Sequence, residues 1–124
     1  MRVYVDSAIF RFRTMIMCHM FSPDLDALHD LAGRIGMERR WFQDPFVMPA
    51  VSWPHYDIAQ PMRDLAVAGG AIECDRLQLL AMSAIVKNIF WKTDRHDPLG
   101  YCRGTRSYER DRLAAWLKEQ GFPQ

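Results

Sequence analysis

Long hydrophobic runs are missing from this chain of 124 residues. The most apolar stretch, 77–91, contains Gln78, Ser83, Lys87 and Asn88. It is shorter than the roughly 20 apolar residues that a membrane-spanning helix needs. The N-terminus, MRVYVDSAIFRFR, carries charges where a signal peptide has its apolar region. These features predict a cytoplasmic protein that does not enter a membrane.

Cysteine and lysine are also scarce. The three cysteines include no CxxC pair and cannot form a disulfide framework, which favours a reducing compartment. Only three of the 16 basic residues are lysine, so arginine, whose planar fork suits carboxylate and phosphate, supplies the rest. Biased codon usage explains the same count. The net charge of +1 gives no overall attraction to nucleic acid.

The best-known catalytic motifs are absent. The chain has no GxSxG, HExxH or HxH sequence, and neither GxxxxGK[ST] nor GxGxxG occurs. These absences argue against a nucleophile elbow, a helical zinc-protease site, a P-loop and a dinucleotide fold. The length and the composition, 49% hydrophobic and 25% charged, are those of one ordinary globular domain.

Strand-like and helix-like patterns alternate along the chain. They predict a small single α/β domain over residues 1–124, with a three- to four-stranded, mostly parallel or mixed sheet flanked by helices. A proline-rich apolar loop, 44–54, has to pack on something, and we expect it to cover the functional site. Strands are expected at 1–6, 14–21, 39–43 and 71–74; helices are expected between Ser22 (N-cap) and Gly36, over 60–68, over 76–90, and over 108–120 after Ser107 (N-cap).

The helix expected over 76–90 is apolar nearly all round. Such a helix is buried on every side, either in its own domain or in an interface. Two arrangements satisfy this requirement. One is a homodimer across the helix, which we favour, and the other is coverage by the C-terminal helix through Trp116 and Leu117.

A run of His55, Tyr56 and Asp57 precedes the helix expected over 60–68. Asp6 ends the first strand, where carboxylates of α/β proteins face a ligand crevice. We expect Asp6, His55 and Asp57 to be catalytic, and Asp6 and Asp57 to hold a divalent cation. Arg63 would bind a phosphate beside the helix N-terminus. The alternative is structural: Asp57 caps the helix, Asp6 is a turn aspartate, and Arg63 pairs with a carboxylate.

Four further residues are expected to bind the ligand. His19 shares a strand face with Met15 and Met17, and a core histidine is its alternative interpretation. The aromatic rings of Trp41, Tyr56 or Trp53 could stack on a base. The predicted ligand-binding set is Arg63, His19, Tyr56, Trp41 and Gln43.

Residues 87–112 combine seven basic side chains with four acidic ones and several aromatics. This pattern is typical of a nucleic-acid surface, although a solvated surface gives the same composition. Nucleic acid is therefore a less favoured partner.

Several segments together resemble a family of small phage and prophage proteins that carry a domain of unknown function. They are YVD (4–6), LDALHDLAGRIG (25–36), RRWFQ (39–43), and HYD (55–57) followed by Arg63 and GA (70–71). The resemblance covers roughly residues 1–74 and leaves 75–124 as a helical extension. This sequence has Ser7 and Met62 where the family pattern has Asp and Lys. The resemblance implies a viral or bacterial origin and no particular activity.

The leading hypothesis is a phage-encoded protein in the host cell cytoplasm that binds a nucleotide or another phosphorylated small molecule, either with or without hydrolysing it. The hydrolysis would be metal-assisted or dependent on His and Asp. One alternative is a non-catalytic accessory or inhibitor protein that binds a host protein. Another is an accessory protein that binds nucleic acid.

Overall fold

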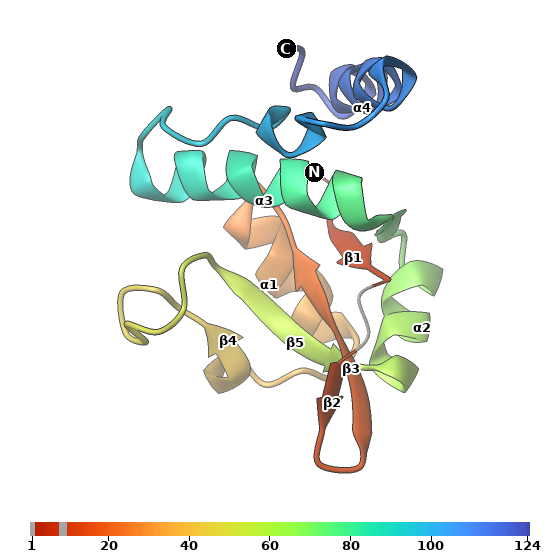
Figure 1. Ribbon diagram of the computed structural model, residues 1–124. Helices are drawn as coiled ribbons and strands as arrows, with labels where there is room; N and C mark the ends of the chain where they lie inside the picture. The colour runs from red at the N-terminus through yellow and green to blue at the C-terminus, as the bar shows by residue number, and fades with distance from the viewer. Residues whose placement is uncertain (1, 8–9) are drawn as a thin grey trace.

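Six strands form one mixed sheet in the computed structural model, which describes residues 2–7 and 10–124 (Figure 1). Along the sheet the order is β4-β5-β3-β1-β6, and β2 pairs with β3 beside this path. Only β1 and β6 are parallel; the other pairs are antiparallel. The strands are β1 (Tyr4–Asp6), β2 (Phe10–Phe12), β3 (Met15–Phe21), β4 (Phe42–Gln43), β5 (His55–Ala59) and β6 (Ile72–Cys74).

The predicted α/β class is therefore confirmed, with the mixed sheet rather than the mostly parallel one. The sheet has more strands than expected because β2 and β5 were not predicted. Both are short, and β5 is the HYDIA segment, whose polar residues drew attention to their chemistry rather than to their alternation. The strand expected over 39–43 divides into a 3₁₀ turn and the two residues of β4. Met1, in the first predicted strand, lies outside the described residues.

Four α-helices occur close to the positions that the sequence predicts. Two of their caps differ from expectation. Asp24, not Ser22, caps α1 by accepting hydrogen bonds from the amides of Asp26 and Ala27. Ser107 is the first residue of α4 rather than its cap. The helices are α1 (Leu25–Arg34), α2 (Gln60–Ala68), α3 (Arg76–Trp91) and α4 (Ser107–Glu119), with 3₁₀ turns at Arg39–Trp41 and Gly100–Cys102.

The two faces of the sheet bury different cores, because alternate side chains of a strand point to opposite faces. One core lies against α1 and α2 and includes Val5, Met20 and Ile58. The other lies against α3 and α4 and includes Tyr4 and Phe21. In Figure 1, α3 crosses the sheet near one end of β3, so the rest of that face lies beyond the helix.

The apolar helix α3 is covered within the chain itself. Seven of its residues are buried, and Leu113 and Leu117 of α4 belong to the same core. Coverage by α4 removes the reason for inferring a dimer across α3. Among the residues that the structure describes, no helix combines the length and the hydropathy that a bilayer crossing requires.

Candidate functional site

Five polar side chains lie on one face of four neighbouring strands. Asp6 ends β1, His19 lies in β3, His55 and Asp57 belong to β5, and Gln43 belongs to β4. The register sets His19 opposite Asp57 and Gln43 opposite His55. These residues share the face of Tyr4 and Phe21. Strand alternation thus gathers most of the predicted site residues at one place.

Asp6 is fully buried and holds His19 in position. One carboxylate oxygen accepts the His19 backbone N–H at 2.8 Å, and the other lies 2.6 Å from His19 Nδ1. Because a carboxylate only accepts, the neutral imidazole carries its proton on Nδ1 and keeps the lone pair on Nε2. Burial opposes protonation of His19, but the hydrogen bond and charge of Asp6, with the charge of Asp57, outweigh it and raise the pKa.

His55 is oriented in the same sense. Its Nδ1 donates to the backbone carbonyl of Trp53 at 2.9 Å, and its ring stacks on the Trp53 ring with centroids 4.7 Å apart. A carbonyl oxygen accepts only, so Nε2 of His55 is also left with its lone pair. In both neutral imidazoles, Nε2 is therefore the nitrogen that can bind a metal ion.

Both Nε2 atoms lie near one oxygen of Asp57. Asp57 Oδ1 lies 3.2 Å from His55 Nε2 and 3.9 Å from His19 Nε2. This oxygen is buried and has no hydrogen-bond partner among the residues that the structure describes. A buried carboxylate oxygen without a donor is costly and requires a partner. Three electron-pair donors that converge in this way fit a cation.

The geometry agrees with that of a transition-metal site. The three ligand atoms lie within 4.8 Å of one another. Ligand atoms that are each about 2.1 Å from an ion lie about 3.0–4.2 Å apart, so a small inward movement would complete the site. Two imidazoles and one carboxylate suit Zn²⁺, Fe²⁺, Co²⁺ or Mn²⁺ better than Mg²⁺ or Ca²⁺. Asp6 would act as the outer carboxylate that fixes a histidine ligand.

An open depression of about 370 Å³ adjoins these three ligands. The proline-rich loop supplies one wall, as the sequence led us to expect. It is attached to α3 through Trp91, whose indole N–H donates to the Ser52 carbonyl, and through the packing of Phe46 on Phe90. The lining residues are Phe10, His19, Gln43, Ala50, Val51, Ser52, Trp53, His55 and Asp57.

Three of the predicted ligand-binding residues lie elsewhere. Arg63 donates from Nε to the Asp6 carbonyl at 2.9 Å and pairs with Glu73 at 2.9 Å, so its guanidinium serves the fold. The Tyr56 hydroxyl contacts His29 at 2.8 Å on the opposite face of the sheet, and the ring is buried. Trp41 is half-exposed and does not line the depression. Neither Tyr56 nor Trp41 lines the depression, and base stacking on these rings stays a prediction.

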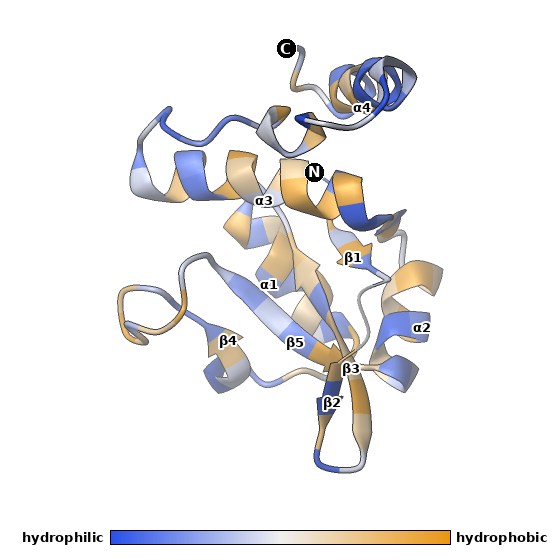
Figure 2. Cartoon of the chain, viewed as in Figure 1, coloured by the Kyte–Doolittle hydropathy of each residue, from blue (hydrophilic) through white to orange (hydrophobic). Residues whose placement is uncertain are grey.

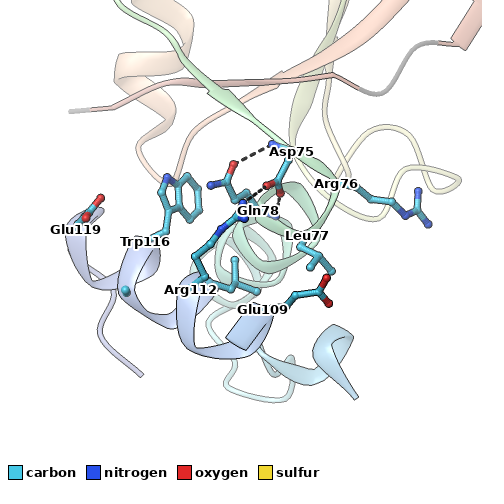
Figure 3. Close-up of a pocket in the computed structure, with 10 residues that line it drawn as sticks. Asp75, Arg76, Leu77, Gln78, Glu109, Arg112, Trp116 and Glu119 are labelled. Atoms are coloured by element: carbon cyan, nitrogen blue, oxygen red, sulfur yellow. Dashed lines mark hydrogen bonds and ion pairs between the residues drawn. The ribbon is translucent and has the colours of Figure 1, made fainter. Parts of the chain in front are cut away.

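A larger hollow of about 470 Å³ lies between the start of α3 and α4 (Figure 3). Three of its polar side chains contact one another. Asp75 and Gln78 form a reciprocal cap at the start of α3, and Arg112 pairs with Asp75 at 3.4 Å. The described residues that line it include neither histidine nor cysteine. We therefore place the candidate site at the smaller depression.

Comparison with known proteins identifies a family for this chain. Residues 3–86, more than half of the 124, match the family described as "Protein of unknown function (DUF4031)". The chain belongs to the DUF4031 family. No curated protein and no solved structure matches it. In this DUF4031 protein, Asp6, His19, His55 and Asp57 all lie within the matched residues, whereas α4 lies beyond them.

The expected resemblance to a domain of unknown function is thus confirmed, and the match runs past residue 74 into α3 of this DUF4031 chain. The sequence analysis predicts that Asp6 and Asp57 together bind a cation. The structure sets His19 between these two carboxylates, with Nδ1 toward Asp6 and Nε2 toward Asp57. The alternation that puts His19 on one strand face was visible in the sequence. Its pairing with Asp57 depends on the β3–β5 register, which no local motif encodes.

Proposed function

We propose that the chain binds one divalent transition-metal ion through His19 Nε2, His55 Nε2 and Asp57 Oδ1, and uses it to hydrolyse a phosphorylated small molecule. The observation that carries the proposal is the convergence of two lone-pair nitrogens on a buried, unpartnered carboxylate oxygen. Asp6 supports it by fixing the proton of His19 on the nitrogen that points away from the ion.

Three protein ligands leave coordination positions for water and substrate on the side of the open depression. This is the arrangement of catalytic rather than structural zinc sites, which keep a position open. A bound ion would polarise a phosphoryl oxygen and lower the pKa of a bound water, so that hydroxide attacks phosphorus at neutral pH. The ion would also supply the positive charge that attracts the phosphate, a role that Arg63 does not fill because it contacts Asp6 and Glu73.

Metal binding is tested first, by calorimetry and thermal shift on the metal-free protein with Zn²⁺, Co²⁺, Mn²⁺ and Mg²⁺. We expect one ion per chain, with Mg²⁺ the weakest. His19→Ala, His55→Ala and Asp57→Ala should each abolish tight binding. His96→Ala is the matched control, because only the backbone of His96 forms hydrogen bonds in the described structure. Tight binding that survives all three substitutions would contradict the site.

Hydrolysis is tested on the metal-loaded protein with a panel of nucleotides, sugar phosphates and aryl phosphates. Turnover should require the metal and disappear in the same three alanine variants. Metal binding without turnover of any compound would contradict the hydrolase and leave a metal-dependent binding protein, which is the non-catalytic alternative.

A further inference from the structure

An apolar stripe leads away from the proposed metal site along the hairpin of β2 and β3. Pairing sets Phe10 opposite Met17 and Phe12 opposite Met15, and strand alternation puts these four residues on the face of His19. The Phe10 ring lies 5.2 Å from the His19 ring. Towards the turn, Phe12 is 54% and Met15 43% exposed. Figure 2 shows the hydrophobic colouring of β3 in this hairpin, which projects from the body of the domain.

The charge of the site limits the negative charge of the compound that it can bind. The two positive charges of a divalent ion would be matched by the carboxylates of Asp57 and Asp6. Among the described residues that line the depression there is no lysine or arginine. Arg63 contacts Asp6 and Glu73 instead, and Arg13 lies over Phe12 at the turn, the far end of the stripe. A compound with several negative charges would therefore lack partners here.

From the stripe and the charge together we infer the substrate class: a singly charged phosphodiester that carries an apolar or aromatic substituent. This inference rests on the proposed metal-dependent hydrolysis. The phosphoryl group binds at the metal, and the substituent lies along Phe10, Phe12, Met15 and Met17. Water adds its oxygen to phosphorus, one ester P–O bond breaks, and the proton from water goes to the departing oxygen. The products are a phosphomonoester and an alcohol.

The charge is tested by comparing aryl phosphates on the metal-loaded protein. Bis(4-nitrophenyl) phosphate carries one negative charge, 4-nitrophenyl phosphate carries two at pH 8, and ATP carries more. We expect kcat/KM for the diester to exceed that for the monoester by about tenfold or more, since only the diester is matched by the site. A monoester or ATP that reacts faster than the diester would overturn the inference.

The stripe is tested with the double variant Phe12→Ser/Met15→Ser. It should raise KM for the aryl diester about fivefold with kcat little changed. This result is expected when the substrate and the transition state lose the same amount of binding free energy. Dimethyl phosphate, which has no large apolar group, should be affected by less than about twofold. Val47→Ser is the control, because Val47 is 74% exposed on the proline-rich loop and does not line the depression.

Calorimetry of metal binding keeps the two proposals apart. If the ion binds and the alanine variants lose it, but the diester has no advantage, the substrate inference is wrong and the metal site stands. If the ion binds without turnover, diphenyl phosphate should still bind about tenfold more tightly than phenyl phosphate, and the reverse order overturns the inference. If light scattering shows a dimer that the double variant makes monomeric, the stripe is an interface between copies, which also overturns it.

Discussion

Asp6→Asn removes one of the two hydrogen bonds that hold His19 in position. The wild-type carboxylate accepts two hydrogen bonds, from the His19 amide at 2.8 Å and from Nδ1 at 2.6 Å, and is fully buried. An asparagine has a single accepting oxygen, so its NH₂ group must face one of these two N–H donors. Two donors then oppose each other, or the imidazole proton moves to Nε2, the atom that would bind the metal.

Two magnitudes follow from this change. Loss of one charge-assisted hydrogen bond at a buried carboxylate costs about 1.5–3 kcal/mol in the free energy of unfolding of the metal-free protein. Loss of the outer carboxylate lowers metal affinity by about 10- to 100-fold. The first quantity is measured by urea unfolding, and the second by calorimetric titration with Zn²⁺ or Co²⁺.

Asp64→Asn is the matched control, since Asp64 is exposed on α2 and, within the described residues, its side chain forms a hydrogen bond only with Gln60, at 3.4 Å. It should change neither quantity. The reasoning is refuted if Asp6→Asn binds the ion as tightly as the wild type, because His19 would then not depend on Asp6 for its orientation. A loss of stability with unchanged metal affinity would reduce Asp6 to a structural carboxylate.

Three further predictions concern other groups. Arg63→Met should lower the free energy of unfolding by about 1–2 kcal/mol and Arg63→Lys by less, in urea unfolding with no ligand present, because the guanidinium satisfies the buried Asp6 carbonyl. Burial raises the pKa of the Cys18 and Cys74 thiols to about 12, so mass spectrometry should show slow alkylation of both at pH 8 until urea unfolds the chain. Without metal, the raised pKa of His19 adds stability below pH 6.5 that is lost as the pH rises through that pKa, and urea unfolding across this range should show no such loss in Asp6→Asn.

The sequence predicts the elements that have strong local signals. The bounds of α2 agree with prediction, because Pro61 near its start and Gly69–Gly70 after its end mark it clearly. The capping box of Asp75 and Gln78 similarly marks the start of α3. Strands β2 and β4 are too short to carry a pattern of their own. They exist because β3 and β5 pair with them. The pairing of β4 with β5 is a long-range contact, whereas β2 and β3 form a local hairpin.

The same distinction applies to the site. Residue chemistry was enough to single out Asp6, His55 and Asp57, and alternation was enough to choose the face of His19. It was not enough to decide what Arg63 contacts, because one of its partners is the carbonyl of Asp6, 57 residues away in β1. Alternation within β5 points Tyr56 away from its two neighbours, but its contact with His29 of α1 is a long-range one that no local pattern shows.

Because His19 pairs directly with Asp57, the proposed metal ligands come together only when β3 and β5 pair in the native register. A slip of β3 by one residue would bring Cys18 or Met20 to the exposed face and bury the imidazole against α1 and α2. An ion that binds only the aligned sheet would lower the free energy of that alignment and of no other. Misaligned chains would be recognisable as the fraction that fails to take up the ion during refolding, even where their helix content is the same.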